Sequence, residues 1–311
     1  PAAEGQRRSA EKLPDIEGPF QQKNGPARLG GTAARRHGGT GMPGRTGAPA
    51  RRQPGAGVTM PAMAAATHRP RGAGPAGAGD PPDDRQLVGL DEGHLVPLAG
   101  GGQLHPAAAA AFEALRADAR AAGFDLAVAS AWRGYARQLA IWNGKLAGER
   151  PVHDDEGRPV ALAGLPLREQ LAAVLRFSAL PGTSRHHWGT DLDVYDASAL
   201  PAGRRPALTP EEVAPGGIFD ALHCWLDERM AAGASHGFYR PYAVDRGGVA
   251  PERWHLSYAP LATRLAPRLT TALLLKSWEE GGQPAGLAAL AEALPALLER
   301  YVAVPEGWAT A

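Results

Sequence analysis

The sequence contains a single cysteine, Cys224, in 311 residues. One cysteine excludes an intrachain disulfide and every zinc site built from several cysteines, but it leaves the cellular compartment open. No apolar run approaches about 18 residues, so the sequence predicts no membrane span. The best candidate for the apolar region of a secretory signal, residues 60–67, is short and weakly apolar, and no export signal can be read from the sequence.

Aromatic residues are scarce, at 6%, whereas 40 glycines and 29 prolines are present. Residues 1–80 alone hold 16 of the glycines and 10 of the prolines, and they lack both the helical and the strand period. Such a segment buries too little apolar surface to offset its conformational entropy, so we expect a disordered Gly/Pro/Arg-rich tail over residues 1–82. Its paired arginines are then either solvated or bound to an anionic partner.

Charge divides the chain at the same place. Residues 1–80 contain 12 Lys and Arg against 5 Asp and Glu, whereas the remainder contains 21 against 27. The body is therefore mildly acidic, and none of its expected helices carries a basic stripe. We expect no specific nucleic-acid binding by the body.

Periodicity in the body predicts helices around a small sheet. Apolar spacing with Pro at helix starts and Gly at helix ends marks helices at 106–122, 135–146, 167–180, 217–232 and 261–302. The last should break at Pro267, near residues 281–284 and at Pro295. Strands are expected at 125–132, 190–196, 237–242 and 253–258, and residues 87–98 fit a short strand or an extended segment. The irregular order of elements favours an α+β fold, a small antiparallel sheet flanked by helices.

Two histidines and an aspartate occupy strand or turn positions that can converge. His186 stands in a turn before Asp193, and His255 lies on the expected strand 253–258. If the strands of Asp193 and His255 pair, both side chains project from one face, and His186 reaches in from the turn. Two imidazoles and one carboxylate, with a fourth position open, suit a catalytic Zn²⁺. The alternative is that these are ordinary surface or core residues.

Three further residues bear on this site. Glu252 lies three residues before His255, close enough to stand beside a metal-bound water. Its carboxylate can take a proton from that water and deliver it to a leaving amine, as amide hydrolysis requires. His187 is an alternative ligand to His186. Asp191 shares the face of Asp193, and it either holds a ligand histidine by a hydrogen bond or is solvated.

The motifs resemble a known family. The two downstream motifs consist of Ser184, His186, Gly189 and Asp193, followed by Glu252, Trp254 and His255. Upstream, residues 130–134 with Gln138 are similar to Ser-Gly-Tyr-Arg-Ser followed by a glutamine. Together they resemble the D-alanyl-D-alanine carboxypeptidases of the VanY type, zinc peptidases of the hedgehog/DD-peptidase fold, over residues 125–260.

The resemblance implies a role for each residue. His186, Asp193 and His255 would bind zinc, and Glu252 would be the general base. Arg133 would stabilise the tetrahedral oxyanion or hold the substrate. Gln138 and Ser184 would contact the peptide and its terminal carboxylate, and Trp254 would contact the substrate or pack so as to orient His255.

The resemblance also implies a function. The expected activity is zinc-dependent hydrolysis of the D-Ala-D-Ala bond of peptidoglycan stem peptides or muropeptides by a monomeric catalytic domain, residues 83–260. Residues 261–311 would be a helical extension packed on it. Such a substrate places the protein in the periplasm or cell envelope, although the missing export signal keeps a cytoplasmic location open.

The sequence departs from the family pattern in three places, and two alternatives to the expected activity stay open. Asp191 replaces a small residue, Arg253 stands where proline is common, and the loop 197–215 lies outside the shared core. The alternatives are an endopeptidase of the same fold and a non-catalytic, zinc-stabilised module that binds the cell wall.

Overall fold

The computed structural model describes residues 80–304. The expected tail, residues 1–82, therefore lies outside the described residues except for its last three positions. Within the described part, a four-stranded antiparallel sheet has the order β3-β4-β6-β5, formed by Leu126–Ser130, Asp191–Asp196, His255–Tyr258 and Phe238–Tyr239. Helices flank this sheet, which confirms the α+β fold class.

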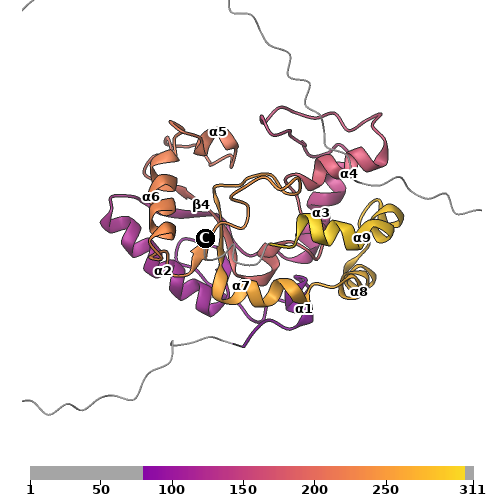
Figure 1. Ribbon diagram of the computed structural model, residues 1–311, viewed down its shortest axis with the longest axis horizontal. Helices are drawn as coiled ribbons and strands as arrows, with labels where there is room; N and C mark the ends of the chain where they lie inside the picture. The colour runs from indigo at the N-terminus through magenta and orange to yellow at the C-terminus, as the bar shows by residue number, and fades with distance from the viewer. Residues whose placement is uncertain (1–79, 305–311) are drawn as a thin grey trace, which may run out of the picture. The chain divides into compact units, whose positions relative to one another are not determined.

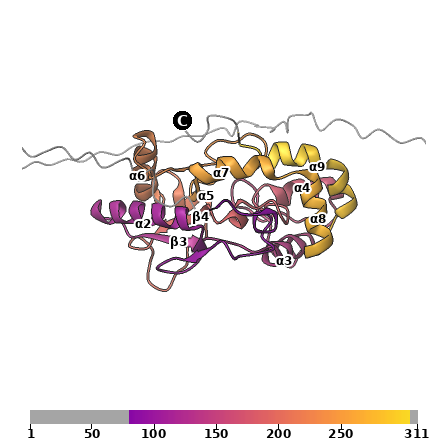
Figure 2. The ribbon, with the colours of Figure 1, turned by 90° about the horizontal axis from the view of Figure 1, so that it is seen from below.

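Two helices cover one side of the sheet. α2 (Pro106–Ala121) begins where Pro106 occupies the first position and the His105 ring accepts a hydrogen bond from the Ala107 amide. Together with α6 (Asp220–Ala231) it buries a core against the strands, in which Phe112, Leu192 and Leu222 are fully buried. Figure 2 shows α2 running beside β3 and β4. The alternation in β4 therefore sends Leu192 and Val194 into this core and leaves Asp191 and Asp193 on the opposite face.

A second core lies among the remaining helices. It gathers side chains of α1 (Asp84–Leu87), α3 (Tyr135–Leu146), α4 (Leu167–Leu175), α7 (Ala259–Leu265), α8 (Thr271–Gly281) and α9 (Leu287–Tyr301). Its largest members are three fully buried tryptophans, Trp142, Trp188 and Trp278. Figure 1 shows α3, α4, α8 and α9 together on one side of β4, with α2 and α6 on the other. The C-terminal helices α7, α8 and α9 thus share a core with α1, α3 and α4, which precede β4 in the chain. The predicted boundary between a catalytic domain and a helical extension at residue 260 stays a prediction.

Two expected elements differ from the structure near the start of the body and in the long loop. Residues 87–98 form only the short strand β1 (Val96–Pro97), paired with β2 (Gln103–Leu104), and helix α1 precedes it. That helix is set by a reciprocal cap between Asp83 and Gln86 rather than by an apolar period. The loop 197–215 contains a helical turn, α5 (Pro210–Val213), that begins at a proline.

The helix predicted over 167–180 ends at Leu175. Beyond it, side chains of α3 hold the chain in an irregular path: Gln138 donates to the Ala179 carbonyl and Lys145 to the Ser178 hydroxyl. The predicted break at Pro295 is also wrong, since α9 continues through it. Burial of Leu290 and Leu294 on the apolar side of α9 offsets the lost backbone hydrogen bond.

No helix among residues 80–304 combines the length and the apolar character that crossing a membrane requires.

Candidate metal centre

Pairing of β4 with β6 sets the position of two candidate ligands. Asp193 lies directly opposite His255 in this antiparallel ladder, so their side chains share one face. His186 comes from the 3₁₀ turn Arg185–Trp188, which ends at Gly189 with φ +71°. A Cβ at Gly189 would meet Leu95 Cδ2 at 2.4 Å and the His105 backbone nitrogen at 2.8 Å, so both the turn and the close packing require glycine.

The three side chains can share one metal ion. One ligand atom from each of His186, Asp193 and His255 lies within 4.8 Å of the others, and all three residues are buried. The Asp193 carboxylate is 3.4 Å from His186 Nε2 and 3.3 Å from His255 Nδ1. Its Oδ1 is buried and makes no hydrogen bond within the described part of the chain. A buried carboxylate beside two imidazole nitrogens, with one oxygen left unpaired, fits a bound cation.

The outer nitrogens of both histidines are already bound to oxygens. His186 Nδ1 lies 2.8 Å from the Ala131 carbonyl, and His255 Nε2 lies 2.9 Å from Asp191 Oδ1. A carbonyl and a carboxylate accept, so each outer nitrogen donates, and His186 Nε2 and His255 Nδ1 are the atoms that would bind a metal ion in place of a proton. Neutral imidazoles held in this way, with a carboxylate, are the donor set that zinc prefers.

Asp191 is buried and is therefore not solvated. Its carboxylate accepts hydrogen bonds from His255, from the Thr190 hydroxyl and from Arg185 Nε at 2.8 Å. Burial alone would raise the pKa of Asp191, but the Arg185 guanidinium, with the hydrogen bonds, holds that pKa well below its usual value. Arg185 in turn donates to Tyr239 and Ser257, so an ion pair sealed from solvent supports His255 from behind.

Negative charge surrounds His255. Burial alone would lower the pKa of this imidazole, but the hydrogen bond with Asp191 and the nearby carboxylates of Asp193 and Glu252 raise the pKa well above 6.5. A site with this charge balance attracts a cation, whether a proton or a metal ion.

Glu252 stands at the edge of the ligand group. Its Oε2 lies 3.4 Å from His255 Nδ1, and 13% of its side chain is exposed. It lines a cavity of about 200 Å³ together with Arg133, His186, Asp193 and His255. The Glu252 carboxylate, the candidate ligands and the Arg133 guanidinium therefore face a common space.

Arg133 is fixed from two sides. Its guanidinium donates to Gln138 Oε1 at 3.0 Å and to Ser130 Oγ at 3.3 Å. Gln138 is fully buried, donates to the Ala179 carbonyl at 2.6 Å and does not line the cavity. The structure thus places Gln138 behind Arg133, where its amide orients the guanidinium, rather than against a bound peptide as predicted.

The other predicted residues have distinct positions. His187 points away from the ligand group, because its ring nitrogens bond with the Arg133 carbonyl and the Gly182 amide. Ser184 and Trp254 both line the cavity. Trp254 also packs against Val213 and Phe219, so its position agrees with either of the two expected roles.

One cavity residue carries no motif signal in the sequence. Tyr242 lies beside the ligand group, its ring centroid 5.0 Å from that of His255. Burial raises the pKa of the Tyr242 phenol to about 12. It stays protonated near neutral pH and can donate a hydrogen bond, which only the folded arrangement reveals.

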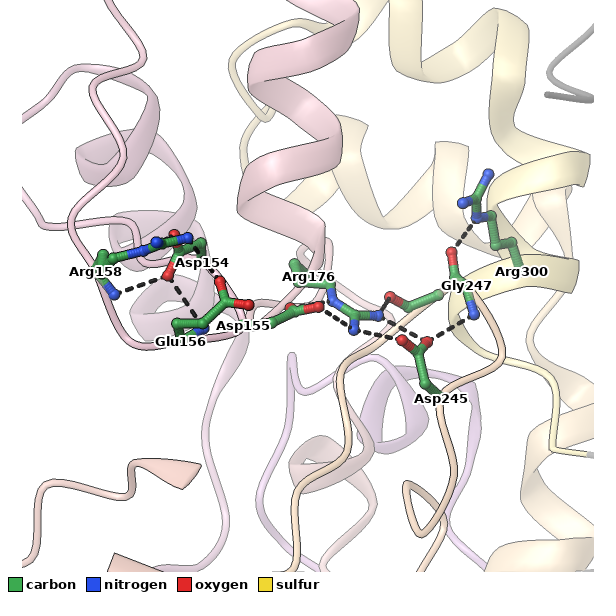
Figure 3. A network of polar contacts seen from close by, with 9 residues as sticks. Asp154, Asp155, Glu156, Arg158, Arg176, Asp245, Gly247 and Arg300 are labelled. Carbon is green, nitrogen blue, oxygen red and sulfur yellow. Dashed lines mark hydrogen bonds and ion pairs between the residues drawn. The ribbon is translucent and has the colours of Figure 1, made fainter. Parts of the chain in front are cut away.

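A polar network, called here the rim network, adjoins two residues that line the cavity; Figure 3 shows the network alone. Arg176, directly after α4, pairs with Asp155 at 2.6 Å and Asp245 at 2.7 Å and donates to the Gly248 carbonyl. Arg300 of α9 donates to the Gly247 carbonyl in the same network. These contacts tie residues 245–248 to the end of α4, and the neighbouring Val249 and Phe177 line the cavity.

Comparison with known proteins adds a family match. The family model described as VanY, D-alanyl-D-alanine carboxypeptidase, matches residues 101–261. An uncharacterised protein of Haemophilus influenzae is 31% identical over 125 residues, which are 40% of this chain and 92% of that protein.

Two solved structures are also similar. The vancomycin-resistance D,D-pentapeptidase VanY in complex with Zn(II) is 26% identical, with a TM-score of 0.39, over 55% of this chain and 82% of that one. VanYB in complex with D-alanine-D-alanine is 22% identical, with a TM-score of 0.40, over 66% of this chain and 90% of that one.

Proposed function

The chain belongs to the VanY family of D-alanyl-D-alanine carboxypeptidases, and on that premise we propose that it is a zinc-dependent carboxypeptidase that hydrolyses the D-Ala-D-Ala bond of peptidoglycan stem peptides. The observation that carries the proposal is the convergence of His186, Asp193 and His255 on one point, beside Glu252, in a cavity that Arg133 also lines. The donor set and the two outer hydrogen bonds of the histidines fit zinc.

In this proposal His186 Nε2, His255 Nδ1 and the Asp193 carboxylate hold the zinc. Bound zinc supplies Lewis acidity, which activates a water near neutral pH and polarises a carbonyl. Asp191, through His255 Nε2, and Ala131, through His186 Nδ1, keep the two imidazoles in the tautomers that binding needs.

Glu252 moves the proton. Its carboxylate accepts a proton from the attacking water and returns it to the amine nitrogen of the departing D-alanine as the carbon–nitrogen bond breaks. Arg133, held by Gln138 and Ser130, donates hydrogen bonds to the oxygen on which negative charge develops. Tyr242, protonated across the working pH range, is a second available donor in the cavity.

Metal analysis and defined substrates test the proposal. Purified protein should contain about one zinc per chain, and a chelator should abolish release of D-alanine from a synthetic stem peptide. Glu252→Ala should retain zinc and lose hydrolysis, whereas the same change at the exposed Glu279 should alter neither. Full activity in metal-free protein contradicts the proposal.

Product masses separate the alternatives. Release of terminal alanine alone supports a carboxypeptidase, whereas internal cleavage of cross-linked fragments supports an endopeptidase. Tight peptidoglycan binding without turnover supports a non-catalytic module. The proposed substrate also places the protein in the periplasm or cell envelope, which fractionation of cells checks.

A further inference from the structure

A lysine stands close to the cavity without an acidic partner. Lysine is rare in this arginine-rich sequence, and the described residues contain only Lys145 and Lys276. Lys145 lies on α3 and is half-buried, with Nζ 2.6 Å from Ser178 Oγ. It forms no ion pair with any carboxylate among residues 80–304. Burial lowers the pKa of this ammonium, as expected for a cation partly removed from water.

Ser178 connects this lysine to the cavity. Ser178 is buried and lines the cavity together with Glu252 and Arg133. The charges that act on Lys145 are attraction from Glu252 and repulsion from Arg133 and Arg150. The stem of Arg150 lies over Gly144, the residue before Lys145. Two like charges therefore add to the positive potential at this end of the cavity, and one acid opposes it.

Holding the segment after α4 in place does not by itself explain why a charged side chain stands at position 145. The segment after α4 is already held one residue further on, where Gln138 donates to the Ala179 carbonyl at 2.6 Å. An ammonium has three donors, and only one of those on Lys145 has a partner among the described residues. Partial desolvation of an unpaired cation costs free energy unless an anion offsets it when it binds.

We propose that Lys145 and Ser178 form a binding site for a carboxylate of the peptide substrate, next to the cavity that Glu252 and Arg133 line. This inference rests on the proposed function and deepens it, because it names a substrate group that the site selects. Ammonium and hydroxyl donors suit a carboxylate, and charge-assisted hydrogen bonds of this kind are about twice as strong as neutral ones. Two groups could occupy the site: the C-terminal carboxylate, or an acidic side chain further along the peptide.

Binding to a variant that cannot turn over tests the site. The full chain, loaded with zinc and carrying Glu252→Ala, is titrated with a synthetic stem peptide that ends in D-Ala-D-Ala. The peptide is used in three forms: fully free, amidated at its C-terminus, or amidated at its acidic side chain. Lys145→Met keeps the apolar stem and removes the charge, and Lys276→Met is the matched control on an exposed lysine.

We expect Lys145→Met to weaken binding of the free peptide by roughly 10- to 100-fold, and Ser178→Ala by a smaller factor. One amidated form should bind the parent more weakly than the free peptide does, and Lys145→Met should not weaken its binding further. The carboxylate that is blocked in that form is the one that the site binds. Lys145→Arg should retain most of the affinity, and Lys276→Met all of it. Zinc content and the urea midpoint show whether each variant is folded. If Lys145→Met does not fold, the affinity of Ser178→Ala for the peptide still tests the site.

Two results contradict the inference in different ways. If the unmutated chain hydrolyses the peptide, but Lys145→Met and Ser178→Ala bind all three forms as their parent does, the carboxylate site is wrong and the proposed function stands. If the unmutated chain neither binds nor hydrolyses the peptide, both are wrong.

Discussion

Removal of the Asp191 carboxylate should affect stability and zinc binding separately. Asp191 and Arg185 have side-chain exposures of 0% and 1%, so water screens their interaction little. Asp191→Ala leaves the Arg185 guanidinium buried without its counter-charge, which typically costs about 3–5 kcal/mol in the free energy of unfolding. It also removes the acceptor for His255 Nε2, and loss of such a partner typically costs about 10- to 100-fold in metal affinity.

A double variant separates the two effects. Arg185→Met with Asp191→Ala removes both charges, so much of the lost stability should return, whereas zinc affinity should stay low because His255 still lacks its acceptor. Urea unfolding of the chelator-treated protein measures the first quantity, and competition with a chromogenic chelator measures the second. Glu156→Ala, which removes an exposed ion pair with Arg158, is the control and should change little.

Either of two results would contradict these roles of Asp191. One is an unfolding free energy of Asp191→Ala within about 1 kcal/mol of the parent, which would show that the buried pair does not behave as a closed unit. The other is full recovery of zinc affinity in the double variant, which would show that Asp191 acts on the ligands only through Arg185.

Three further changes test the cavity and its surroundings. Arg133→Met should retain zinc and lower kcat by on the order of 10²–10³-fold, because it removes donors to the developing oxyanion; an unchanged kcat would contradict this role. Arg176→Ala should speed proteolysis within residues 243–249, since both ion pairs of the rim network are lost (Figure 3), and equal cleavage rates would contradict it. The pKa of His223 is lowered to about 3, chiefly by burial, with Arg240 adding to the effect, whereas the unfolded chain takes up that proton near pH 6.5. Stability of the metal-free protein should therefore fall as the pH drops from 6.5 toward 3, and His223→Leu should flatten that part of the urea-midpoint profile.

Much of the fold follows from local pattern. Helix 135–146 has the predicted bounds, because its apolar spacing and the glycine before it act locally. The placement of Asp193 opposite His255 also follows from strand alternation, once the two strands pair. The end of α4 could not be predicted in this way. The apolar period continues to Phe177, but the helix ends before it. Gln138 and Lys145 bind residues 178 and 179 in a non-helical path, through contacts that span about 30 to 40 residues of sequence.

The site shows the same division. Residue types and spacing identified the candidate ligands and Glu252, since metal chemistry restricts which side chains can serve. The sequence left two roles open for Asp191, because its burial and its partner Arg185 cannot be read from spacing. It predicted that Gln138 contacts the peptide, because the burial of Gln138 behind Arg133 cannot be read from spacing either. Tyr242 and Lys145 belong to no motif. Only the folding of the segment before Glu252 places Tyr242 in the cavity, and only the folding of α3 places Lys145 against Ser178, which lines it.

Anomalous diffraction at the zinc edge, from crystals of the zinc-loaded protein, would locate the metal itself. We expect one strong peak bonded to His186 Nε2, His255 Nδ1 and the Asp193 carboxylate at about 2.0–2.2 Å, with Glu252 beside it but outside the ligand set. A peak bonded to other residues, or no peak where these three side chains meet, would contradict it.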